Sequence, residues 1–209
     1  MDEAFSVDEF VNNEAYQEDM INNMKLLREL LDLPHIKGCK FATAELIASY
    51  YDVSLNQIKM LRRKHKEAFE ITGVRYMSAK KILSFFAKSN DYDQYRDLDL
   101  TQYYIRPLLI ENTENGVILD RTALNSTRNT VYSYKSVILM GALIHGSEIA
   151  INMKCILPNA KEIYETDKQI KTLSAEITIY GDDEEKAERI QELRRGLYEE
   201  YGLYIDDFR

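Results

Sequence analysis

The sequence predicts a mainly α-helical protein with small β-hairpins. Apolar residues recur at three- and four-residue spacing along much of the chain, as on one face of a helix. The 209 residues include three proline and eight glycine residues, a content typical of a compact chain without long flexible linkers. Two β-prone pairs of runs, one beside Gly73 and one beside Gly116, predict the hairpins.

Residues 7–33 are expected to form one or two acidic helices. Apolar residues from Met20 to Leu31 make a stripe on this segment, and Pro34 ends it. We interpret the stripe as packing on its own domain, and the alternative is a partner surface.

Residues 43–66 predict two short helices joined by a tight turn. Ser54 is suited to cap the second helix, and Gln57, three residues later, completes a capping box. Ile58 and Leu61 return to the core, so the polar and cationic residues between them point outward. The first helix has a buried face made by Ala44, Leu46, Ile47 and Ala48.

This pattern predicts a helix-turn-helix whose second helix enters a DNA major groove. Side chains near the start of that helix would reach base edges, and the cations after them would contact phosphates. The candidate DNA-binding residues are Ser54, Asn56, Gln57, Lys59, Met60, Arg62, Arg63, Lys64 and Lys66, with Arg75 from the following segment. The alternative is that an ordinary solvated helix carries these cations.

A wing is expected directly after the helix-turn-helix. Two β-prone runs within residues 69–77 flank Thr72 and Gly73, and predict a small hairpin on which Arg75 would contact the phosphate backbone. The alternative role of this hairpin is to close the small core. Ser78 is then suited to cap a further helix over residues 79–87.

The charge distribution favours this interpretation. The chain has 35 Asp+Glu and 27 Lys+Arg residues, a net charge of -8. Residues 35–88 carry +7, whereas residues 1–34 carry -7, residues 89–159 carry -2 and residues 160–209 carry -6. Attraction to phosphate requires a local basic face rather than a basic protein.

The second half begins with a polar connector rich in Asp and Tyr. Apolar runs at 108–110 and 117–119 then bracket an Asn-Gly pair, which predicts a hairpin. Ser133 and Ser147 are placed to start two apolar, nearly uncharged helices, and we expect this pair to form a buried core.

Residues 160–209 predict two more helices, as a helical hairpin or a coiled coil. Asp182 with Glu185 is suited to cap the second of them. Their apolar stripe has too little nearby chain to cover it unless it folds onto the core at 133–157 or meets another copy. Of these two possibilities, we expect a homodimer through residues 160–201. The predicted domains are acidic helices at 1–34, a winged helix-turn-helix at 35–88, a linker at 89–105, an apolar hairpin with paired helices at 106–159, and an acidic helical region at 160–209.

Residues 30–82 (LLDLPHIKGCKFATAELIASYYDVSLNQIKMLRRKHKEAFEITGVRYMSAKKI) carry a resemblance to known proteins. They resemble the N-terminal module of small helix-turn-helix regulators carried by phages and mobile elements of Firmicutes. GALIHGSEIAINMKCILPNAKE resembles a second segment of those proteins, so the likeness spans about residues 24–165. Residues 126–135 depart from the pattern, because they lack the usual basic-aromatic-proline cluster. The resemblance implies a DNA-binding or antirepressor-like protein.

Nothing in the sequence predicts an enzyme, a metal site or a cofactor. The three histidines are far apart, and there is no glycine-rich phosphate loop. We interpret the four aspartates between Asp91 and Asp99 as a solvated linker, since they lack the glycine and terminal glutamate of a calcium loop. Cys39 and Cys155 are expected to be free thiols in a reducing cytoplasm. The longest apolar run is too short to span a bilayer.

Two functional hypotheses follow. The first is a DNA-binding transcriptional regulator of a phage or mobile element, with double-stranded DNA as its partner. The alternative is a protein-binding inhibitor of a host nucleic-acid-handling or defence protein, of the anti-CRISPR or another anti-defence type, whose acidic ends occupy a basic surface. The basic block favours the first hypothesis, and the acidic flanks favour the second.

Overall fold

The computed structural model describes residues 5–36, 40–86, 108–113, 116–120, 128–180 and 183–201. The chain divides into two compact units. One, here called the acidic unit, joins Met1–Asp32 to Glu148–Arg209 and has 24 Asp+Glu against 11 Lys+Arg. The other, here called the basic unit, is Leu33–Ser147, with 16 Lys+Arg against 11 Asp+Glu. The net charges are therefore -13 and +5.

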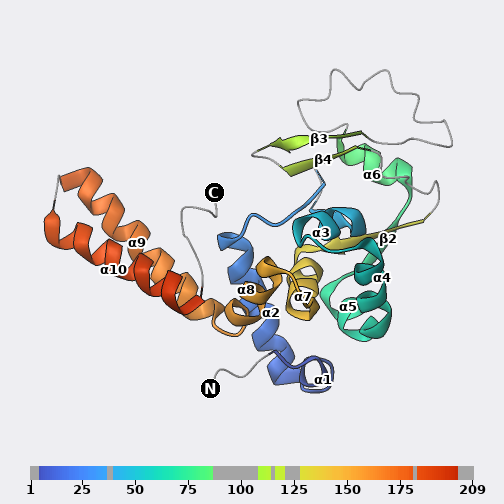
Figure 1. Cartoon of the computed structure of the whole chain (residues 1–209), viewed down its shortest axis with the longest axis horizontal. Coiled ribbons are helices and arrows are strands. Elements are labelled where there is room, and N and C mark those ends of the chain that lie inside the picture. The colour runs from blue at the N-terminus through green and yellow to red at the C-terminus, as the bar shows by residue number, and fades with distance from the viewer. Residues whose placement is uncertain are drawn as a thin grey trace. The chain divides into compact units, whose positions relative to one another are not determined.

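The basic unit combines short helices with short strands (Figure 1). Its elements are β1 (Phe41–Thr43), α3 (Ala44–Tyr50), α4 (Leu55–Lys64), α5 (Lys66–Thr72), β2 (Arg75–Met77), α6 (Ala79–Phe86), β3 (Leu108–Thr113), β4 (Gly116–Asp120), β5 (Asn129–Ser133) and α7 (Tyr134–Leu143). The mainly helical class with small β-structure is therefore confirmed.

Three strands of the basic unit form an antiparallel sheet in the order β1-β5-β2. Phe41 pairs with Ser133 on one side of the central strand, and Tyr76 pairs with Thr130 on the other. Val131 and Tyr132 of β5 are buried, so the central strand contributes to the core. β1 and β5 were not predicted. The predicted hairpin at β3 and β4 is confirmed, with Ile110 opposite Ile118.

The expected hairpin around Thr72 and Gly73 is wrong. Residues up to Thr72 belong to helix α5, and Gly73 ends that helix in the left-handed conformation, with φ +94°. The N–H groups of Gly73 and Val74 both donate to the carbonyl of Phe69, which closes the helix end. Glycine adopts a positive φ both at a left-handed helix end and in a tight hairpin turn. Gly73 in the sequence therefore does not distinguish these two structures. β2 follows, and it pairs with β5 instead.

Helix α7 fills the core of the basic unit. The Ser133 hydroxyl accepts a hydrogen bond from the N–H of Ser136, as predicted for a capping serine. Every residue from Ser136 to Leu143 is buried, in agreement with the predicted apolar helix. The helix expected to pair with it, α8 (Glu148–Ile156), belongs to the acidic unit. The predicted core pair is thus divided between the two units.

The described part of the acidic unit consists of helices. They are α1 (Val7–Asn12), α2 (Glu14–Leu30), α8, α9 (Ala160–Tyr180) and α10 (Glu184–Tyr201). Ser6 and Asn13 cap the first two, which confirms two N-terminal helices. The cap of α10 is Asp183, whose carboxylate accepts from the N–H of Lys186 at 3.2 Å. The predicted cap, Asp182, lies outside the described residues.

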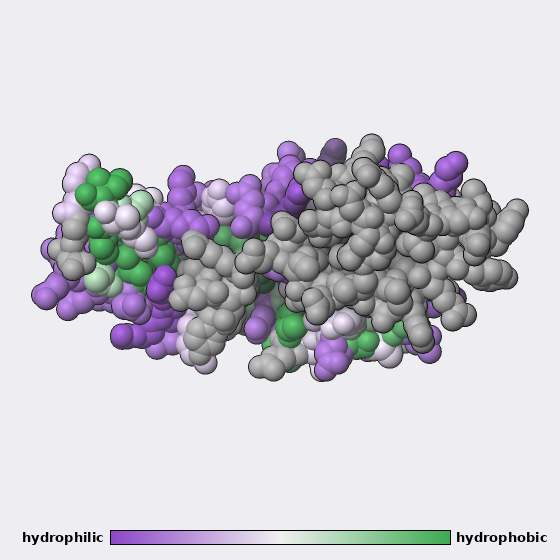
Figure 2. Space-filling model, turned by 90° about the horizontal axis from the view of Figure 1, so that it is seen from above, coloured by the Kyte–Doolittle hydropathy of each residue, from purple (hydrophilic) through white to green (hydrophobic). Residues whose placement is uncertain are grey.

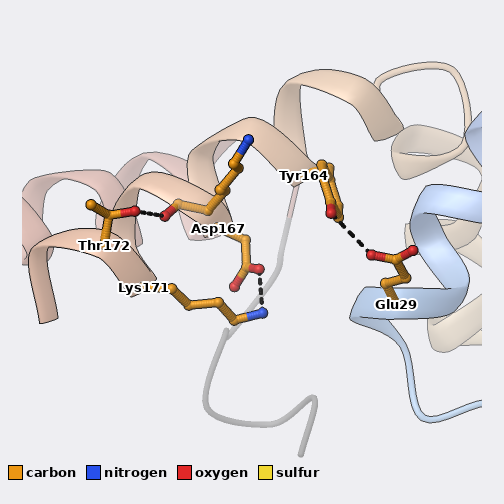
Figure 3. Close-up of polar contacts among 6 residues, drawn as sticks. Glu29, Tyr164, Asp167, Lys171 and Thr172 are labelled. Atoms are coloured by element: carbon orange, nitrogen blue, oxygen red, sulfur yellow. Dashed lines mark hydrogen bonds and ion pairs between the residues drawn. The ribbon is translucent and has the colours of Figure 1, made fainter. Parts of the chain in front are cut away.

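Contacts within the acidic unit cover the first half of the apolar stripe of α9. Ile163 and Ile170 are buried, and both α2 and α10 pack against α9. Polar contacts add to this packing: Tyr164 donates to the Glu29 carboxylate at 3.0 Å, and the buried Asp167 pairs with Lys171 at 2.6 Å (Figure 3). The later part of the stripe, from Leu173 to Tyr180, is only partly covered, so the expected homodimer stays a prediction.

Several predicted features fall outside the described residues, namely the connector at 89–105 with its aspartates, and Cys39. Cys155 is an exposed free thiol. Among the described helices, none has both the length and the apolar character needed to cross a bilayer.

Candidate nucleic-acid interface

Two capped helices and a tight turn position the candidate interface. The Thr43 hydroxyl caps α3 by accepting from the N–H of Leu46 at 3.3 Å. The turn contains Asp52 with φ 49°, in the left-handed region that Asp tolerates better than most residues. Ser54 then caps α4 by accepting from the N–H of Gln57 at 3.2 Å. The predicted start of the second helix is confirmed.

One face of α4 packs on the basic unit and the opposite face is open to solvent. Ile58 is fully buried, whereas Asn56, Lys59, Met60 and Arg63 are exposed. These four residues are spaced three and four apart, so they lie together along one stripe, here called the α4 outer face. Met60 lies within this stripe and is 64% exposed.

Gln57 does not complete the predicted capping box. Its side-chain amide donates to the carbonyl of His145, just after α7, at 3.3 Å. This hydrogen bond ties the first turn of α4 to the end of the core helix. Of the two residues predicted to reach base edges, Asn56 is therefore the exposed one, and Gln57 is held against the protein.

The last turn of α4 carries Arg62, Arg63 and Lys64. Cations at a helix C-terminus interact favourably with the helix dipole, so they contribute to the stability of α4 whatever else they bind. Lys66, the next predicted phosphate contact, forms an exposed ion pair with Glu70 at 3.5 Å. Arg63 and Lys64 are exposed.

Tyr76 is a functional candidate that sequence reasoning missed. Its hydroxyl accepts a hydrogen bond from the guanidinium of Arg62, and its ring lies 3.8 Å from the guanidinium carbon of Arg128. The side chain is half exposed. The two arginines lower the pKa of Tyr76, with the Arg62 hydrogen bond as the largest cause. Here the three residues are called the Arg-Tyr-Arg cluster.

The sheet register explains this cluster. Because Tyr76 pairs with Thr130, Arg128, which directly precedes β5, lies diagonally across from Tyr76 on the same face. Arg62 reaches the same face from the last turn of α4. The cluster could be predicted from the sequence only if the pairing of β2 with β5 were known, and these two strands lie far apart in the chain.

Arg75, the last predicted contact, is exposed on β2 and lies over the ring of Phe41 at 5.7 Å. It belongs to a strand of the three-stranded sheet and not to the predicted hairpin.

No set of three His, Cys, Asp or Glu side chains suited to a metal ion occurs in the part of the chain that the structure describes. Comparison of the whole sequence and structure with protein-family models, with curated proteins and with solved structures gives no significant match.

Proposed function

We propose that the basic unit is a winged helix-turn-helix module that binds double-stranded DNA, in a transcriptional regulator of a phage or mobile element. The order of its elements supports this. A strand, β1, precedes the two helices α3 and α4, and two further strands, β2 and β5, follow them. The last strand lies between the other two in the sheet, as in winged-helix domains.

The α4 outer face is the observation that carries this proposal. A helix fits the DNA major groove, which is about 12 Å wide. Asparagine pairs well with adenine in that groove, and lysine and arginine side chains beside it contact phosphates. Asn56, Lys59 and Arg63 present these groups on one exposed stripe. The +5 charge of the basic unit adds attraction to phosphate.

A mobility-shift assay on DNA from the gene's own locus tests the proposal. Lys59→Ala combined with Arg63→Ala should weaken binding and lower the slope of log affinity against log salt by about two units, since each lost phosphate contact removes about one. Lys168→Ala with Arg195→Ala removes the same charge from exposed positions of the acidic unit and serves as the matched control. Equal binding by the α4 variant and the control would remove α4 from the proposal.

The charge of the acidic unit favours a second candidate function. A net charge of -13 on one unit repels DNA but suits a basic surface of another protein. We propose as the alternative that this unit inhibits a host protein which itself handles nucleic acid. Replacing exposed acidic residues of α10 by glutamine should then weaken capture of that protein from host lysate, with DNA binding retained.

We also propose that the protein self-associates through the end of α9. Ile179 and Tyr180 are 70% and 81% exposed, and Figure 2 shows hydrophobic residues gathered at this end of the helical hairpin. Light scattering of the wild type and of Ile179→Ser with Tyr180→Ser should show a smaller species for the variant. A wild type that is monomeric at micromolar concentration would contradict this proposal.

A further inference from the structure

The Arg-Tyr-Arg cluster brings two positive charges to one exposed aromatic ring. Arg62 donates to the Tyr76 hydroxyl oxygen and lies 5.4 Å from the ring centre. Arg128 lies over the same ring at 3.8 Å. Two guanidinium groups at one ring place two positive charges together, and a bound anion would interact favourably with both.

The cluster holds donor types suited to such an anion. The Tyr76 oxygen already accepts from Arg62, so its own O–H points away from that guanidinium and is free to donate elsewhere. Each guanidinium has five N–H donors in a planar fork that matches two oxygens of a phosphate. A phosphodiester would thus receive hydrogen bonds from a hydroxyl and from two arginines.

The cluster also has a defined place in the basic unit. Arg62 comes from the last turn of α4, Tyr76 comes from β2, and Arg128 directly precedes β5. The α4 outer face and the cluster therefore belong to neighbouring elements. The α4 outer face is exposed at Arg63, and the cluster is exposed at Tyr76.

We infer that Arg62, Tyr76 and Arg128 form a binding site for one phosphodiester group of the DNA backbone, beside the groove that α4 enters. This inference rests on the proposed DNA binding. It assigns to Tyr76 and Arg128 a role in holding the backbone, and it gives Arg62 two partners, the tyrosine hydroxyl and the phosphate. Such a contact fixes the position of the protein on the duplex and carries no sequence information.

Fluorescence anisotropy with a labelled mixed-sequence DNA duplex over a range of salt concentrations tests the site. Arg62→Gln and Arg128→Gln should each lower the salt slope by about one unit. Tyr76→Phe keeps the ring and removes the donor, so affinity should fall by about three- to tenfold with the slope unchanged. Arg189→Gln, an exposed arginine of the acidic unit, is the control and should leave both quantities unchanged.

A second measurement separates failure of this site from failure of the proposed function. NMR signals of the Tyr76 ring and the Arg128 guanidinium should shift when millimolar inorganic phosphate is added to the wild type, and not in Arg128→Gln. Duplex binding with unchanged salt slopes in both arginine variants would overturn the site and leave DNA binding by α4 standing. Phosphate shifts without duplex binding would support the anion site and defeat the proposed function. Absence of any phosphate shift at Tyr76 would overturn the site.

Discussion

The hydroxyl of Tyr51, at the turn between α3 and α4, donates a hydrogen bond to the carbonyl of Val137 in α7 at 3.0 Å. Both residues are buried in the basic unit, and burial is the main reason that the pKa of Tyr51 lies well above its usual value. This contact, with the one from Gln57 to His145, fixes the turn and the start of α4 on the core helix.

Tyr51→Phe should therefore destabilise the protein. The ring still fills its site, but the hydrogen bond is lost, and we expect the free energy of unfolding to fall by about 1 kcal/mol. Urea unfolding measures this change. Tyr180→Phe removes the same hydroxyl from a side chain that is 81% exposed and should leave the midpoint unchanged. Coincident midpoints for the Tyr51 variant and the wild type would contradict the prediction.

Gly73 should be intolerant of a side chain, because φ is +94° at this position. Gly73→Ala should lower the free energy of unfolding by about 1–2 kcal/mol, the strain of a left-handed L-residue. Crowding does not contribute, since an added Cβ would lie 3.7 Å from its nearest neighbour, the Ser133 hydroxyl. Gly196→Ala, in the middle of α10 with open space around it, should instead stabilise the protein by about 0.5–1 kcal/mol. Thermal unfolding of the Gly73→Ala and Gly196→Ala variants tests this contrast. Equal shifts of the two melting temperatures in the same direction would refute it.

Tyr132 should make the protein sensitive to alkali. Burial raises the pKa of Tyr132 from 10.0 to about 12. Its contribution to stability is fully present below pH 10 and is lost as pH rises from 10 to about 12, because only the unfolded state loses the proton in that interval. Relative to wild type, Tyr132→Phe should gain about 1.4 kcal/mol per pH unit across this window. Urea unfolding at several pH values measures the difference in free energy of unfolding between this variant and the wild type. A difference that does not change with pH would exclude this explanation.

Neutralising exposed acids of α10 should strengthen DNA binding. Glu184→Gln, Glu188→Gln and Glu199→Gln together reduce the charge of the acidic unit from -13 to -10. Weaker repulsion of phosphate should tighten binding a few-fold at low salt, and the effect should fade as screening increases. Replacing the exposed Gln169 and Gln191 by asparagine changes no charge and serves as the control. A loss of affinity would mean that these carboxylates do not act by repulsion.

Features that depend on neighbouring residues could be predicted from the sequence. Ser54 and Ser133 were expected at helix starts, and each hydroxyl caps its helix, because the capping bond joins residues three apart. The outward direction of Lys59 and Arg63 followed from the helical period in the same way.

Features that depend on distant partners could not be predicted. β5 is a five-residue strand whose role as the central strand depends on two partners elsewhere in the chain. Tyr76 and Arg128 meet only through that pairing. The hydrogen bond of Gln57 to His145 likewise replaced a local capping role with a distant one. Gly73 shows a third difficulty, since one local preference for positive φ serves both a helix end and a hairpin turn.

The central place of β5 has a consequence for synthesis on the ribosome. β1 and β2 emerge early, but neither has its sheet partner until residues 129–133 leave the exit tunnel. Until then both short strands have unpaired edges, and the nascent helices α3 and α4 lack the core helix α7. Pairing β5 with strands so distant in the chain closes long loops, which slows folding. We therefore expect the basic unit to fold late and cooperatively. A chain released before β5 would contain the whole of α4 and still lack the scaffold that holds it.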